Sequence, residues 1–338
     1  MRLILAFVFA ALALGGCDAP MRKTSSNTPK LDMSQLDKDV RKIAGRIGPG
    51  VLGVGLMNLD SGEVWTFNGE RRFPLQGAFA APLGAAVLAE IEAGRLRPDE
   101  TLTLTDEQIS PPHSPLADAW PARSNYTVDE LLRAAVGGSD NTAADVLMKR
   151  IGGPGAVTAW LTDKHVEELR IDRYQRQLRP DSLGMASFRT AWKGEAAFNA
   201  ALATVPPGQR FAAMQTYLRD PQDSVTPRGM LTFLDGLADG ELLSPTSTKR
   251  LLQLMAETPV GQTRLKAGLP EGARLAHKTG ITGAGSGFSP AVNDIGIVTL
   301  PDGRSYAVAI FLAGARLSAA DSDAVIAQVA QAITRGVD

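Results

Sequence analysis

The amino-acid sequence predicts an α+β fold, an α/β sandwich in which both ends of the chain build one antiparallel sheet and the middle forms an all-helical lobe. Two observations lead to this prediction. Short segments rich in β-branched residues and bounded by turn residues lie near both ends, and the stretch between them is rich in Ala, Leu and helix-capping residues. The apolar faces of these strands and helices are best buried when helices cover a single sheet. The helical lobe, about residues 70–225, is then inserted between the strands of the two ends.

The predicted domain begins with a helix and two strands. Ser34-x-x-Asp37 can cap a helix whose apolar positions share one face, namely Leu36, Val40, Ile43 and Ile47. Val51–Leu59 and Glu63–Phe67 are predicted strands, and an Asp60-Ser61-Gly62 turn joins them. An Ala- and Leu-rich helix follows from about Ala78 to Glu92.

Capping residues and glycines divide the middle of the chain into short helices. Thr127-x-x-Glu130 is a capping box that opens a helix ending at Gly137-Gly138, and another helix begins at Asn141. The C-terminal part returns to strands and closes with a helix that has Val325, Ile326, Val329 and Ile333 on one face. The predicted strands are His277–Thr279, Asp294–Leu300 and Ser305–Phe311.

The first 17 residues have the pattern of an export signal. Arg2 supplies a basic start, Leu3 to Leu14 an apolar stretch, and Gly15-Gly16 the small residues of a cleavage site. Cys17 stands where bacterial lipoproteins carry their lipidated residue; an ordinary signal peptide with an incidental cysteine is the alternative. We therefore expect an exported, periplasmic protein that is anchored to a membrane by a lipid on Cys17, with residues 18–33 as a flexible tether.

Composition narrows the classes of partner for the domain of residues 34–338. A net charge of −1 without a basic stripe argues against nucleic acid. The three histidines and the single cysteine show no metal-ligand spacing, and we expect neither a metal nor another cofactor. One thiol forms no internal disulfide, so the core must hold the fold unaided. We expect a monomer.

Two short motifs point to a serine hydrolase. Ser139-Asp140-Asn141 and Lys278-Thr279-Gly280 are two of the three elements of penicillin-recognising serine enzymes. The third, Ser-x-x-Lys, belongs at the start of an apolar helix about sixty residues before Ser-Asp-Asn. That place holds Phe73-Pro74-Leu75-Gln76-Gly77-Ala78-Phe79-Ala80, and no Ser-x-x-Lys occurs anywhere in the chain. A displaced Thr-x-x-Lys starting at Thr190, Thr246 or Thr263 is a remote alternative.

The chain resembles the class A serine β-lactamases from about residue 34 to its C-terminus, with one interruption. The matching segments follow the family's order and include Ser139–Pro154, Leu169–Tyr174, Thr226-Pro227, Gly240–Leu243 and Lys278–Gly280. Gln76, His277 and Asn293-Asp294 are similar to an extended-spectrum subgroup. The resemblance implies the β-lactamase/transpeptidase-like fold.

In the resembling family a serine attacks the lactam, a lysine one helical turn later helps remove its proton, and an omega-loop glutamate orients the hydrolytic water. Residue by residue, the resemblance places Gly77 at the serine, Ala80 at the lysine and Gln175 at the glutamate. Gly77 has no side chain, Ala80 has no amine, and the Gln175 amide cannot accept the proton of a water near neutral pH. We therefore expect no acyl transfer by this chain.

The resemblance implies that the binding groups remain. Ser139 and Asn141 would contact the ligand, Lys278 and Thr279 would meet its carboxylate, and Gly280 would let the strand edge approach closely. The backbone N–H groups of Gly77 and Ile281 would form the oxyanion hole. The expected ligand is a β-lactam or a D-alanyl-peptide-like molecule. The alternative is that both triplets merely fit the fold.

A second departure from the family lies between Asp181 and Ser224, where the family's connection is much shorter. The insert, about residues 181–224, carries Phe188, Trp192, Phe198, Phe211 and Tyr217. It is either an enlarged omega-loop lid at the rim of the pocket or a surface helical pair without ligand contact. Arg179 also replaces a family asparagine that helps hold the hydrolytic water.

Three functions compete for the chain. The first is a catalytically inactive class A β-lactamase relative that binds ligand without turnover, which we favour. The second is an active β-lactamase that uses another nucleophile such as Ser139, and the third is a non-catalytic cell-envelope binding module. Because the three catalytic positions are changed while the binding triplets stand, we expect that a parent with Ser, Lys and Glu restored would hydrolyse β-lactams through an acyl-enzyme.

Overall fold

The computed structural model describes residues 30–282 and 291–337. Within these ranges one five-stranded antiparallel sheet has the order β2-β1-β9-β8-β7. The strands are β1 Val51–Asn58, β2 Val64–Phe67, β7 Arg274–Ile281, β8 Ala291–Thr299 and β9 Ser305–Ala313. The predicted α+β fold is therefore confirmed, with strands from both ends of the chain meeting where β1 pairs with β9. The predicted signal peptide, Cys17 and most of the tether lie outside the described residues.

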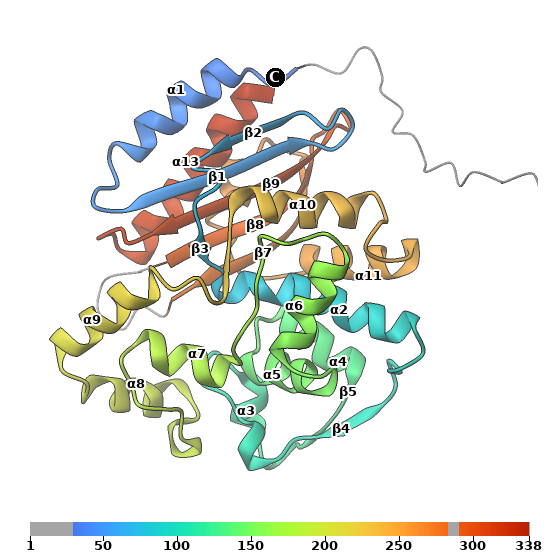
Figure 1. The fold of residues 1–338 in the computed structure, drawn as a ribbon, viewed down its shortest axis with the longest axis vertical. Helices are drawn as coiled ribbons and strands as arrows, with labels where there is room; N and C mark the ends of the chain where they lie inside the picture. The colour runs from blue at the N-terminus through green and yellow to red at the C-terminus, as the bar shows by residue number, and fades with distance from the viewer. Residues whose placement is uncertain (1–29, 283–290, 338) are drawn as a thin grey trace, which may run out of the picture.

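Two terminal helices, α1 Met33–Ala44 and α13 Ala319–Val337, pack together on the outer face of the sheet (Figure 1). The apolar face predicted for each helix is buried there, including Leu36, Val40 and Val329. The predicted cap at Ser34 is wrong by two residues. Asp32 is the N-cap, and its carboxylate accepts a hydrogen bond from Gln35 N at 2.9 Å. Ser34 and Asp37 therefore lie inside the helix.

The helical lobe lies against the other face and the β7 edge of the sheet (Figure 1). Its helices are α2 Ala80–Glu92, α3 Pro115–Ala119, α4 Val128–Leu132, α5 Asn141–Arg150, α6 Pro154–Asp163, α7 Gln175–Ser182, α8 Glu195–Ala203, α9 Pro207–Tyr217, α10 Pro227–Ala238 and α11 Pro245–Ala256. The short helix α12 Leu265–Gly268 packs instead against α13 on the outer face. Two small ladders complete the lobe: β3 Phe73–Pro74 with β6 Ser224–Val225, and β4 Thr101–Thr103 with β5 Asn125–Thr127. The predicted capping box of Thr127 and Glu130 opens α4.

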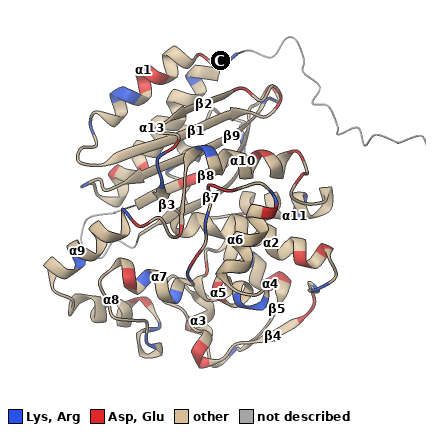
Figure 2. Ribbon diagram, viewed as in Figure 1, with Lys and Arg blue, Asp and Glu red and all other residues tan. Residues whose placement is uncertain are grey.

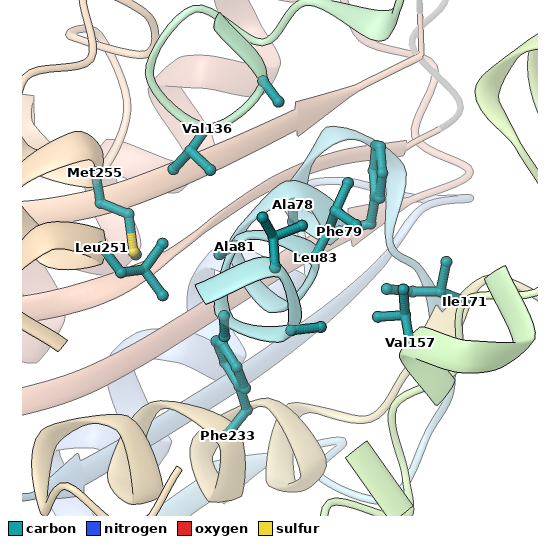
Figure 3. Close-up of a cluster of buried hydrophobic side chains, with 14 of the residues drawn as sticks. Ala78, Phe79, Ala81, Leu83, Val136, Val157, Ile171, Phe233, Leu251 and Met255 are labelled. Carbon is teal, nitrogen blue, oxygen red and sulfur yellow. The ribbon is translucent and has the colours of Figure 1, made fainter. Parts of the chain in front are cut away.

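Helix α2 runs through the centre of the lobe and is almost entirely apolar. Figure 3 shows side chains of other elements, including Val136, Phe233 and Leu251, arranged around it. A β-carbon at Gly84 would lie 2.8 Å from Val136 Cγ2, so only glycine permits this close approach. Helix α2 is preceded by a 3₁₀ turn, η1, at Gln76–Phe79, and the packing of α2 fixes where that turn meets the sheet.

Charged residues of both signs are interspersed on α1 and around the lobe (Figure 2). Among the described residues, no helix combines the length and the apolar character that crossing a bilayer requires. In the same ranges no cluster of three or more His, Cys, Asp or Glu side chains has a geometry that could hold a metal ion.

Candidate functional site

The candidate site lies at the free edge of β7, where this strand meets the 3₁₀ turn η1. Gln76, the first residue of η1, is buried and has a left-handed φ of 47°. A β-carbon at Gly77 would lie 2.9 Å from Thr279 O and 3.8 Å from Lys278 Nζ. A β-carbon at Gly280 would lie 2.8 Å from Leu75 O. The turn and the strand therefore meet backbone to backbone, through one glycine on each side.

A side-chain amide from the neighbouring strand holds this contact in place. Asn293 on β8 donates hydrogen bonds to Pro74 O at 2.7 Å and to Leu75 O at 2.9 Å. Arg264 donates to Gly280 O at 3.2 Å and to Asn293 O at 3.1 Å, and its Nε donates to Asp323 at 2.6 Å. Sequence reasoning missed the role of Arg264, because nothing in its local pattern distinguishes it from a surface arginine.

The Ser139-Asp140-Asn141 triplet forms the turn that enters α5. Ser139 has a φ of 58°, and Asp140 is the N-cap of α5, accepting a hydrogen bond from Ala143 N at 2.9 Å. Asp140 also accepts one from Leu116 N at 2.8 Å, as expected for a residue that holds its own loop. Burial raises the pKa of the Asp140 carboxyl, and these hydrogen bonds oppose that rise. Asn141 donates to Pro111 O at 3.0 Å.

Lys278 joins the strand to the serine turn. The side chain is 1% exposed, and its Nζ donates to Ser139 Oγ at 2.7 Å and to Thr279 O at 3.0 Å. Burial lowers the pKa of Lys278 to about 7; the nearby carboxylate of Asp294 opposes the shift, and Arg264 adds to it. The amine is thus close to half-protonated at neutral pH. A ligand carboxylate placed beside it would favour the charged form.

The remaining predicted positions, Ala80 and Gln175, are both buried. Ala80 is 2% exposed and begins α2, one helical turn after Gly77. Gln175 is 6% exposed and begins α7, where its N–H donates to Asp145 Oδ1 at 2.7 Å. Burial raises the pKa of Asp145 to about 6, opposed by hydrogen bonds from Ser110 and from the start of α7. Asp145 was missed as well, because it lies inside a predicted helix.

A tyrosine of the insert bonds the first residue of η1. Tyr217, the last residue of α9, is buried, and its hydroxyl accepts a hydrogen bond from Gln76 Nε2. Burial raises the pKa of this hydroxyl. Phe188 and Phe198 instead pack into a separate small core with Ile109, away from the turn. Part of the insert therefore touches η1, and part of it covers the lobe.

A single arginine ties the two ends of the insert together. Arg173 Nε donates to Asp223 at 2.6 Å, and its Nη2 donates to Asp220 at 2.9 Å. Asp181 lies 3.7 Å from Nη1. Because the guanidinium is largely enclosed and has three carboxylate neighbours, it closes the base of the loop that carries α7, α8 and α9.

The sheet, the inserted lobe and the two triplets that meet at the β7 edge define a penicillin-recognising serine hydrolase fold. The model of the β-lactamase enzyme family matches residues 35–337. The chain belongs to this family, whose activity is β-lactam hydrolysis, and its relatives include class A members.

Several relatives resemble the chain over most of its length. β-Lactamase VEB-1 from Pseudomonas aeruginosa is 27% identical over 281 residues, 83% of each chain. The extended-spectrum β-lactamase PER-1 from the same organism is 30% identical over 288 residues, 83% of this chain and 80% of that protein.

Solved structures agree with this assignment. A class A β-lactamase described as the last common ancestor of Gram-negative bacteria (GNCA4) has a TM-score of 0.72 and 31% identity, covering 90% of this chain and 99% of that one. A β-lactamase from Xanthomonas campestris has a TM-score of 0.73 and 27% identity, covering 91% and 99%.

Proposed function

We propose that this chain binds β-lactams, or D-alanyl-peptide-like ligands, without hydrolysing them. The observation that carries the proposal is the position of Gly77. It faces Thr279 O and Lys278 Nζ, where the resemblance places the family's nucleophile, and it has no side chain. A covalent acyl-enzyme needs an oxygen or sulfur atom at this point, and the chain supplies none.

Two further positions support the loss of chemistry. Ala80 leaves no amine one helical turn after Gly77, and Gln175 offers an amide in place of a carboxylate. Removing the nucleophile alone costs about a million-fold in turnover in a well-studied serine protease, and the members of such a unit do not act additively. With three members replaced, we expect no measurable acyl transfer.

The binding groups support a retained affinity. Lys278, Thr279 and Ser139 gather their polar atoms at the β7 edge, and Lys278 carries positive charge below neutral pH. The backbone N–H groups of Gly77 and Ile281 belong to segments that lie against each other there. Backbone donors need no particular side chain, so they still polarise a bound carbonyl.

The test combines two measurements on the purified chain. Benzylpenicillin should raise the melting temperature, because a ligand that binds only the native state stabilises it. Intact-mass spectrometry of the same sample should show no added mass, and a chromogenic cephalosporin should stay intact. An adduct of one penicillin per chain would contradict the proposal.

One observation favours a second candidate, an active enzyme that uses Ser139. Lys278 Nζ lies 2.7 Å from Ser139 Oγ, and a lysine with a pKa of about 7 is a competent general base. Ser139→Ala separates the two candidates. It would abolish an adduct formed on Ser139, whereas the favoured proposal predicts no adduct in either protein.

We also propose export and attachment to a membrane by a lipid on Cys17. The basic start, the apolar stretch and the single cysteine after Gly15-Gly16 support it. Expression in a Gram-negative host followed by fractionation tests it. The wild-type protein should be found with the membranes, and Cys17→Ala should not; equal distributions would contradict lipidation.

A further inference from the structure

Within the described residues, one arginine at the site lacks the carboxylate partners that two other enclosed arginines, Arg173 and Arg264, possess. Arg179 lies in the second turn of α7, which packs between α5 and α9 (Figure 1). Its Nη1 donates to Ile281 O at 3.4 Å. Its Nε is shielded from solvent and has no hydrogen-bond partner in the described parts of the chain. Over the same ranges no carboxylate oxygen lies within 4.0 Å of the guanidinium.

Two other enclosed arginines have carboxylates beside them. Arg173 has three aspartates around it, and Arg264 has Asp323 and two carbonyl oxygens. Glu195, at the start of α8, acts on Arg179 only from a distance. The segment 283–290, which the structure does not describe, contains no Asp or Glu in its sequence.

An enclosed cation without an anion is unfavourable. Taking a charged group out of water costs several kcal/mol unless a partner of opposite charge replaces the lost hydration. Accordingly, burial lowers the pKa of Arg179, although a guanidinium remains charged near neutral pH. A guanidinium has five N–H donors, and only one described hydrogen bond uses them. The remaining donors suit a carboxylate, which can accept two of them in parallel.

The guanidinium of Arg179 lies next to the candidate site. Residues two apart on a strand direct their backbone groups to the same edge, so Ile281 O lies on the edge that Thr279 O presents to η1. Arg179 therefore sits beside the residue whose N–H would complete the oxyanion hole. Lys278 is three residues back along β7, about 10 Å away at the usual rise of a strand.

We propose that Arg179 receives a second anionic group of the ligand, so that the site selects β-lactams or peptides with a carboxylate on the acyl side as well as the carboxylate that meets Lys278. This inference rests on the proposed function. The residue Arg179 as a whole is partly exposed to solvent. Ligand binding thereby supplies the anionic partner that Arg179 lacks among residues 30–282 and 291–337.

The test uses two penicillins that differ by one carboxylate. Carbenicillin is benzylpenicillin with a carboxylate on the α-carbon of its side chain. Calorimetry should show that the wild type binds carbenicillin about tenfold or more tightly than benzylpenicillin, the usual worth of a charge-assisted hydrogen bond. Arg179→Gln should remove this preference while leaving benzylpenicillin affinity within about twofold.

A matched control lies on the same helix. Arg176 has its guanidinium over the Phe188 ring, 5.9 Å from the centroid, and Arg176→Gln should keep the preference for carbenicillin. If Arg179 were only structural, Arg179→Gln would weaken both penicillins equally and lower the melting temperature. We expect instead a melting temperature at or above that of the wild type, because an uncompensated charge is removed.

The outcomes separate this inference from the proposed function. If benzylpenicillin binds and carbenicillin gains nothing, the role of Arg179 is overturned and the proposed function stands. If neither penicillin binds, the proposed function fails. The role of Arg179 is then tested with the free acids that correspond to the two penicillin side chains, phenylacetate and phenylmalonate. Phenylmalonate should then raise the melting temperature of the wild type more than phenylacetate does, with no such difference in Arg179→Gln. Equal shifts in both proteins would overturn the inference.

Discussion

The two sides of the candidate site differ in their polar side chains. On the β7 side, Lys278, Thr279 and Ser139 are polar, and Lys278 Nζ is hydrogen-bonded to Ser139 Oγ and Thr279 O. On the η1–α7 side, the matching positions carry a hydrogen atom at Gly77, a methyl group at Ala80 and an amide at Gln175. In the proposed function, ligand recognition and bond-making therefore belong to different elements of this fold, and only the first is retained.

The largest expected effect comes from restoring the family's catalytic side chains on the η1–α7 side. Gly77→Ser, Ala80→Lys and Gln175→Glu together should raise the turnover of a chromogenic cephalosporin by several orders of magnitude, up to about a million-fold. A β-carbon added at Gly77 would meet Thr279 O at 2.9 Å, so the strand must shift by a few tenths of an ångström. The Gly77→Ser single variant is the control, and a triple variant without activity would break the comparison.

The second-largest effect is expected from removing the amine of Lys278 on the β7 side. Lys278→Met should weaken benzylpenicillin binding by about 10- to 100-fold, because a charge-assisted hydrogen bond to the carboxylate is lost. Lys266→Met is the matched control, since this exposed lysine bonds only Gln262 in the described structure. Calorimetry measures both. Unchanged affinity in Lys278→Met would show that the ligand does not use the β7 edge.

The same lysine predicts a pH dependence. With its pKa lowered to about 7, Lys278 is charged below this pH in both the free and the bound protein. A bound carboxylate raises the pKa, so binding takes up a proton when the pH exceeds 7. Affinity for benzylpenicillin should be constant below pH 7 and fall by up to about tenfold per pH unit above it. A flat profile from pH 6 to 9 would contradict this assignment.

The smallest expected effect concerns the hydrogen bond between Tyr217 of the insert and Gln76 of η1. Tyr217→Phe leaves Gln76 Nε2 without its partner in a buried position and should lower the free energy of unfolding by about 1–3 kcal/mol. Urea unfolding measures this. In the double variant with Gln76→Met the two losses should not add, because each single variant removes the same hydrogen bond. Additive losses would mean that the two residues act independently.

The sequence predicts the regular elements well and the long-range contacts poorly. The five strands follow from β-branched runs between turns, and the Thr127 box follows from residues three apart. The predicted start of α1 is wrong, because Asp32 and Ser34 both suit an N-cap and only the folded chain chooses between them. Local patterns also place the triplets in order along the chain, which is why the family and the fold could be recognised.

The parts of the site that were missed join distant segments. Tyr217 and Gln76 are 141 residues apart, and Arg173 and Asp223 are 50 apart. Arg264 and Asp145 have the local sequence of ordinary solvent-facing charges, yet both are buried. No periodicity reports such contacts, because they depend on how the lobe and the sheet are packed together. That Arg179 has no carboxylate neighbour among the described residues is likewise visible only in the folded chain.

Arg173 also determines how freely the insert can vary. Asp181 and Asp220 stand at opposite ends of the segment that holds α8 and α9, and one guanidinium contacts both. The chain between them therefore leaves and returns at one point. A relative's shorter connection, grafted between these two aspartates, should keep this base closed, but it would remove the bond of Tyr217 to Gln76 and the packing of Phe188 and Phe198 against Ile109.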